Sequence, residues 1–186
     1  MKKKLRLIAL TILLLPITGM AQDIFEKYND NSEVTYVSIK PKMFQMIANM
    51  GINVDDPEAK AYMDMVKSIT SFKTLVTDNK NISADITKWV KSRSSALEEL
   101  MEVKDEGSEV KFYVKEGKDS NHVKELLIFV NGINKVMKES VEINGEQRRI
   151  ETVVVSLTGD INLNEISKLT EKMNIPGGKN LEKKKK

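Results

Sequence analysis

Few side chains of this sequence could do nucleophilic or acid–base chemistry, because it contains one histidine, His122, and no cysteine. A catalytic triad or a histidine metal site needs that imidazole beside a nucleophile or further ligands. His122 ends the polar run Asp119-Ser120-Asn121-His122, which is typical of a solvated turn because these residues hydrogen-bond to nearby backbone. We interpret His122 as a turn residue and keep it as a candidate binding residue.

Carboxylates are plentiful, and acidic neighbours stand at Asp55–Asp56, Glu98–Glu99 and Asp105–Glu106. A glycosidase needs two carboxyls that face each other across a cleft with separated pKa values, which sequence neighbours do not provide. Asp160 is kept as a binding candidate, because a strand-to-helix corner after Gly159 would place it beside free backbone donors. A turn or capping role for Asp160 is the simpler interpretation.

Five methionines cluster in the segment before residue 66: Met43, Met46, Met50, Met63 and Met65. Helical spacing favours core packing, with Met43 and Met50 in register with apolar neighbours. An apolar groove for a partner and a thioether site for Cu(I) are the alternatives. We keep Met43, Met46 and Met50 as binding candidates, and we expect no catalytic residues, no metal ligands and no cofactor.

Composition excludes several classes of protein. The chain has 186 residues, of which 40% are hydrophobic and 31% charged, which is typical of a globular domain. The absence of cysteine excludes disulfides, a thiol nucleophile, cysteine-ligated metal clusters and the acylated cysteine of a lipoprotein. The sequence contains no glycine-rich phosphate loop and no aromatic–basic platform for nucleic acid.

The N-terminus is typical of a secretory signal peptide. Lys2, Lys3, Lys4 and Arg6 precede an apolar run from Leu7 to Leu15, and Gly19-Met-Ala21 fits the small-residue cleavage pattern. The run is about half of the ~20 residues that a spanning helix needs, so a retained anchor is the weaker alternative. We expect cleavage after Ala21 and a periplasmic or secreted protein that is not a lipoprotein.

Removal of the signal changes the charge. The four signal bases leave 26 basic against 27 acidic residues, and residues 22–178 alone carry 21 against 26. We therefore expect no nucleic-acid partner. The predicted division is a signal peptide over 1–21, one domain over 22–178 and a disordered basic tail over 179–186. At most weak contact with anionic membrane is expected, through Lys183, Lys184, Lys185 and Lys186.

The elements predict an α+β domain with a mixed, mainly antiparallel sheet and helices on one face, in the order β-α-α-β-α-β-β-β-β-α. The predicted strands and helices, in chain order, cover 33–39, 41–50, 57–66, 69–77, 83–101, 110–115, 123–130, 139–143, 147–157 and 162–173. Ser83 is the predicted cap of the longest helix, Asn144-Gly145 predicts a hairpin turn, and Asn162 a helix cap. A parallel pairing of the first two strands would require a right-handed crossover.

Several segments together resemble the exported Bacteroidetes proteins grouped as the domain of unknown function numbered 4252. They are Ile24–Tyr28, Val34–Ile39, Lys42-Met43-Phe44, Glu125-Leu126-Leu127, Leu157–Leu163 and Ile166–Leu169. The resemblance implies a small exported or lipid-anchored envelope protein without established activity or transferable catalytic residues. This chain departs from the pattern in two ways. It lacks the lipidated cysteine, and its segment over Ile133–Arg149 is longer than a simple strand connection in that pattern.

These observations favour an exported, non-catalytic module that recognises an envelope protein through a sheet edge or through the methionine-bearing helices. One alternative is a small extracytoplasmic hydrolase that uses Asp160, a second carboxylate and His122, which would have to meet in one concave pocket. A methionine-based metal-binding protein is the other.

Overall fold

The computed structural model describes residues 23–50, 56–133, 141–143 and 146–166. The predicted signal peptide, the turn at Asn144-Gly145, the final helix beyond Ile166 and the basic tail lie outside these residues. Asn162 accepts a hydrogen bond from the Asn164 backbone N–H at 2.9 Å, which is the capping contact expected at the start of that helix.

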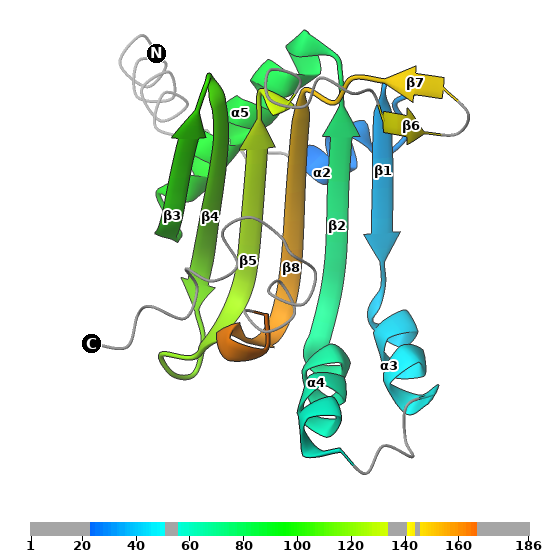
Figure 1. The fold of residues 1–186 in the computed structure, drawn as a ribbon, viewed down its shortest axis with the longest axis vertical. Coiled ribbons are helices and arrows are strands. Elements are labelled where there is room, and N and C mark those ends of the chain that lie inside the picture. The colour runs from blue at the N-terminus through cyan, green and yellow to red at the C-terminus, as the bar shows by residue number, and fades with distance from the viewer. Residues whose placement is uncertain (1–22, 51–55, 134–140, 144–145, 167–186) are drawn as a thin grey trace, which may run out of the picture.

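Six strands form one sheet in the order β1-β2-β8-β5-β4-β3, and every pairing between these described strands is antiparallel (Figure 1). Their bounds are β1 Val34–Ile39, β2 Ile69–Thr77, β3 Glu98–Asp105, β4 Ser108–Glu116, β5 His122–Asn131 and β8 Thr152–Asn162. The longest strands, β5 and β8, lie side by side in the middle of the sheet. The predicted α+β class and mainly antiparallel sheet are confirmed.

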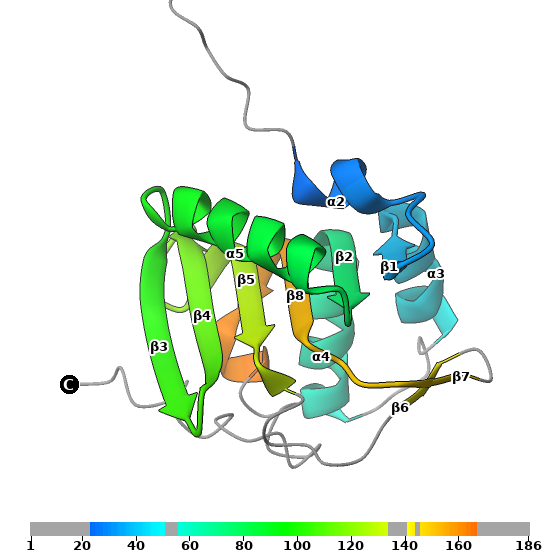
Figure 2. The same ribbon diagram turned by 90° about the horizontal axis from the view of Figure 1, so that it is seen from above.

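Two helices, α2 (Ile24–Tyr28) and α5 (Lys80–Ser94), lie on the same face of the sheet (Figure 2). Two further helices, α3 (Pro41–Met50) and α4 (Pro57–Ser68), extend beyond the ends of β1 and β2 (Figure 1). Because α3 and α4 together reverse the chain, β2 returns antiparallel to β1, and the parallel pairing considered from the sequence is wrong.

A two-stranded hairpin stands apart from the main sheet. It pairs β6 (Val141–Ile143) with β7 (Glu146–Arg148), with Ile143 opposite Glu146. This confirms the hairpin predicted around Asn144-Gly145. The second arm was predicted to run on to Leu157 without a break, but it ends at Arg148 and the central strand β8 begins separately at Thr152.

The main core lies between α5 and the sheet. Leu75, Leu127 and Val154 from the three central strands are 0% exposed, and Ile86 of α5 is equally buried against them. Phe25 of α2 belongs to the same cluster. Alternate residues of each strand face this core because side chains of a strand point to opposite faces in turn.

The predicted helix over residues 83–101 is wrong at both ends. The helix α5 begins after Asn79, whose side chain accepts hydrogen bonds from the Asn81 and Ile82 backbone N–H groups, so Asn79 is the cap rather than Ser83. The buried Ser83 hydroxyl instead lies 2.6 Å from that of Thr152. The segment after Ser94 forms the edge strand β3, because its backbone groups pair with β4.

Candidate functional site

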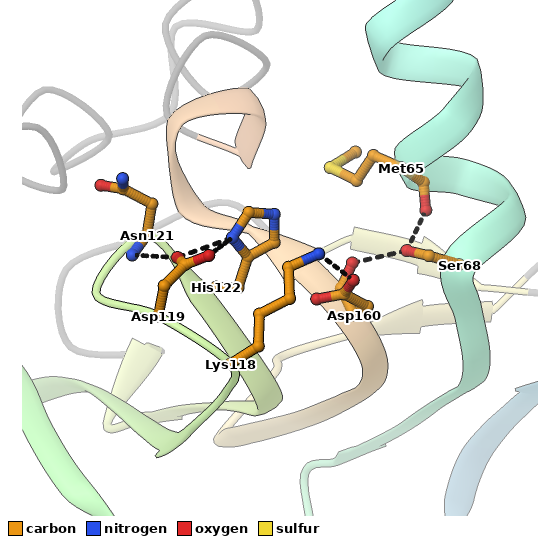
Figure 3. Close-up of polar contacts among 7 residues, drawn as sticks. All are labelled: Met65, Ser68, Lys118, Asp119, Asn121, His122 and Asp160. Atoms are coloured by element: carbon orange, nitrogen blue, oxygen red, sulfur yellow. Dashed lines mark hydrogen bonds and ion pairs between the residues drawn. The ribbon is translucent and has the colours of Figure 1, made fainter.

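His122 and Asp119 form a close pair at the turn between β4 and β5 (Figure 3). The imidazole Nδ1 lies 2.7 and 2.9 Å from the two Asp119 carboxylate oxygens, and the Asn121 backbone N–H donates to Asp119 at 2.9 Å. The hydrogen bond from His122 and that from the Asn121 backbone lower the pKa of Asp119. The contacts are those of a residue that organises its own turn.

Asp160 lies within β8 and not at a strand-to-helix corner, because β8 continues to Asn162. Its carboxylate accepts a hydrogen bond from the Lys118 ammonium at 2.6 Å, and its backbone carbonyl accepts one from the Ser68 hydroxyl at 2.6 Å (Figure 3). Ser68 also donates to the Met65 carbonyl at 2.7 Å. Asp160 therefore ties β8 to the end of α4 and to the β4–β5 turn.

The two pairs do not combine into a hydrolytic centre among the described residues. A cavity of about 480 Å³ is lined by Lys118, Asp119, Ser120 and His122, but Asp160 does not line it. No described hydroxyl is hydrogen-bonded to the imidazole, although a nucleophile and its base must lie within that reach. The carboxylate of Asp160 is instead paired with an ammonium group.

Two methionines of α3, Met43 and Met46, face solvent. Met43 is 45% exposed, Met46 is 51% exposed, and Ile47 beside them is 39% exposed. The core position predicted for Met43 is wrong, because Phe44 and Ala48, four residues apart, form the face that packs toward α4. The side chain of Met50 lies outside the described part of the structure.

The two edges of the sheet differ in charge. Five of the eight residues of β3 are charged, and Lys111 of β4 bridges Glu102 at 3.0 Å and Glu109 at 2.8 Å beside it. The other edge strand, β1, has the sequence VTYVSI and carries no charge. Charged edge strands resist pairing with other chains, whereas an uncharged edge leaves its backbone groups available. Among the described strands, none pairs with the outer side of β1.

The charge network on β3 gives a testable pKa. Hydrogen bonds from Lys104 and Lys111 lower the pKa of Glu102 to about 2 from an ordinary 4.5. Because the folded pKa is depressed, the network stabilises the fold above pH 4.5 and loses that contribution as the pH falls toward 2. A carboxyl-detected NMR titration should show Glu102 titrating well below the ordinary 4.5. A midpoint for Glu102 near 4.5 would contradict the network.

A second cavity, of about 340 Å³, lies on the helix-covered face and was not predicted from the sequence. Its walls include Asp23, Lys73, Arg93 and Glu125, which come from four different elements or their ends. Their signal in the sequence is weak: Lys73 is the one charged residue of β2, and Glu125 directly follows Lys124 in β5. Nothing in the spacing indicates that they meet in space.

The charged groups of this cavity are paired with one another. Arg93 donates from one terminal nitrogen to both oxygens of Glu125, at 2.8 and 2.7 Å. Lys73 donates to Asp23 and to Glu26, each at 2.9 Å. Burial lowers the pKa of Lys73, but the hydrogen bonds to Glu26 and Asp23 outweigh that effect and raise it above its usual value.

Within the described ranges, no three histidine, cysteine or acidic side chains are grouped so that they could hold a metal ion. No helix in those ranges combines the length and the apolar character needed to cross a bilayer.

Comparison with known proteins gives one match. The family model described as "Domain of unknown function (DUF4252)" matches residues 28–169, which include every strand of the main sheet. No curated protein and no solved structure matches the chain.

Proposed function

We propose that this protein, which belongs to the DUF4252 family, is an exported, non-catalytic binding module of the cell envelope. The family itself assigns no activity to the chain. Its partner is an extended segment of another envelope protein, which adds to the sheet at β1. This mode of recognition uses main-chain hydrogen bonds for affinity and side-chain contacts for specificity.

The contrast between the two edges of the sheet is the observation that carries this proposal. The edge strand β1 is uncharged, whereas β3 carries the charges that discourage edge pairing. Val37 of β1 is 41% exposed although valine is a residue that strands usually bury. The two edges of one sheet therefore differ in the property that controls strand addition.

The exposed side chains of α3 support the same docking position for the partner segment. One residue, Lys40, separates the end of β1 from the start of this helix, and α3 extends from that end of the edge strand (Figure 1). Its exposed side chains Met43, Met46 and Ile47 are therefore close along the chain to β1. Methionine side chains are flexible and polarisable, and they adapt to apolar surfaces of varied shape. The partner segment is accordingly expected to be uncharged where it pairs with β1 and apolar where it reaches α3.

Export to the envelope is part of the proposal and rests on residues 1–21. Their basic start, short apolar run and small-residue ending favour cleavage after Ala21 and release without a lipid anchor. N-terminal sequencing of the protein from its native cells should give Gln22 as the first residue. Recovery of the intact chain from the cytosol would contradict export.

A photo-crosslinking experiment tests the docking edge. A photo-reactive amino acid is placed at Met46 in one variant and at Val103 of β3 in another, and both are expressed in the native host. The Met46 probe should give one discrete adduct with an envelope protein, and the Val103 probe should not. Identical adducts from the two positions, or none from either, would overturn the proposal.

The matched substitutions Val37→Lys and Val103→Lys provide the control. Both valines face the same side of the sheet at opposite edges, and they are 41% and 44% exposed. A lysine on the free edge should abolish the Met46 adduct because it opposes strand addition. The same change on β3 should leave the adduct intact, which separates loss of binding from loss of folding.

A further inference from the structure

The cavity between α2, α5 and the sheet interrupts the apolar pattern of the core. On β8 the core face carries Val154 and then Ser156 and Thr158, and on β2 it carries Leu75 and then Lys73 and Ser71. Half of this face is thus filled by large apolar side chains. The other half is lined by short hydroxyl side chains, which leave an open space of about 340 Å³.

The cavity has aromatic and charged walls above this hydroxyl floor. Phe25 and Trp89 meet edge to face, with ring centres 5.7 Å apart. The guanidinium carbon of Arg93 lies 5.8 Å from the centre of the Trp89 ring. The ammonium nitrogen of Lys73 lies 5.7 Å from the ring centre of Phe25. An aromatic wall beside a few placed polar groups is the usual composition of a small-molecule site, and the volume lies at the lower end of such sites.

The charges of the cavity are satisfied internally. Lys73 is bound by Asp23 and by Glu26, which lies outside the cavity, and Arg93 is bound by Glu125. The four charged residues that line the cavity therefore balance, two acidic and two basic. An anionic ligand would meet no unpaired cation. A cationic ligand would have to compete with ammonium or guanidinium groups already in contact with each carboxylate.

The floor of the cavity offers polar groups that a ligand can reach. The hydroxyls of Ser71 and Ser156 can each donate and accept, and they face the same space.

We propose that this cavity binds a neutral polyhydroxylated molecule of monosaccharide size. Such a ligand supplies alternating donors and acceptors to the serine and threonine hydroxyls. Its carbon-bound hydrogens pack against the aromatic wall. The site is distinct from the β1 edge. Its lining residues lie on the helix-covered face of the sheet, and none of them belongs to β1.

Trp89 is the only tryptophan of the chain and lines the cavity, so its fluorescence reports on occupancy. The purified chain from residue 22 is titrated separately with glucose, galactose, mannose and N-acetylglucosamine, and with acetate as the anionic comparison. At least one sugar should give a saturable change with a Kd of about 1 mM or tighter. Acetate should give none.

Two substitutions locate the binding. Ser156→Leu fills the floor of the cavity and should abolish the saturable response, whereas Ser95→Leu, on an exposed residue at the end of α5, should leave it unchanged. Circular dichroism of each variant verifies that it is folded.

The proposal is overturned if none of the four sugars gives a saturable change at this affinity, which would mean that the cavity holds water only. It is also overturned if acetate binds as well as the sugars, or if folded Ser156→Leu protein responds like the unmodified chain. None of these outcomes depends on the β1 edge, so the two sites are tested independently.

Discussion

Replacing Phe129 with alanine should destabilise the fold by about 3–5 kcal/mol, the range for truncating a large aromatic side chain in a core. Phe129 lies in the central strand β5 and is 2% exposed. It belongs to the cluster in which Leu75, Leu127 and Ile86 are fully buried, so the space that it leaves cannot be filled by solvent-facing side chains.

Urea denaturation of the chain from residue 22, followed by circular dichroism, measures this loss. The control is Val103→Ala, because Val103 is 44% exposed on the edge strand β3 and should change the unfolding free energy by about 0.5 kcal/mol or less. Equal losses for the two variants would contradict the placement of the core between α5 and the sheet.

Replacing Gly159 with alanine should be comparably severe, for a different reason. Gly159 has a φ of +149°, a conformation that residues with a side chain rarely adopt and that costs them on the order of 1–3 kcal/mol. An added Cβ would also lie 2.4 Å from the Ser68 carbonyl oxygen, which is backbone and cannot rotate away. We expect a total loss of about 3 kcal/mol or more.

Asp160→Ala is the matched control for Gly159→Ala. Asp160 is the next residue of β8, and its side-chain ion pair with Lys118 is solvent-exposed, so its loss should cost about 1 kcal/mol or less. Thermal unfolding of the two variants compares them directly. A Gly159→Ala protein as stable as the Asp160→Ala protein would show that β8 does not pass this close to the end of α4.

Much of the fold follows from local signals in the sequence. The strands over 110–115 and 123–130 were predicted from alternating or apolar runs, and the hairpin around Asn144-Gly145 from its turn residues. The cap at Asn162 and the start of α4 at Pro57 were predicted from side chains that act on their own helix. These features depend on residues that are close in sequence, and such residues can be judged without knowledge of the fold.

The edge strand β3 could not be predicted in this way. Leu97, Leu100 and Met101 are spaced like one face of a helix, and the segment Glu98–Asp105 has a single β-branched residue, Val103. Its strand conformation depends on pairing with β4, which satisfies its backbone groups. Pairing with the neighbouring strand β4 therefore outweighs the helical preference of this segment's own sequence.

The candidate sites show the same difference between contacts of residues that are close in sequence and contacts of residues that are far apart. His122 and Asp119, three residues apart, lie in the turn that their polar run predicts. The polar cavity was missed because its contacts join residues far apart in sequence: Arg93 and Glu125 are 32 residues apart, and Lys73 and Asp23 are 50 apart. The exposure of Met43 was missed because helical spacing does not say which of two apolar stripes meets the neighbouring helix.

Amide hydrogen exchange tests the central claim, that β1 is the docking edge, most directly. The chain from residue 22 is compared alone and after incubation with an envelope extract of its native host. Exchange at Val34–Ile39 should become slower in the extract because a partner strand protects the outward-facing amides, and exchange at Glu98–Asp105 should stay the same. Unchanged exchange at β1, or slowing confined to β3, would contradict the account.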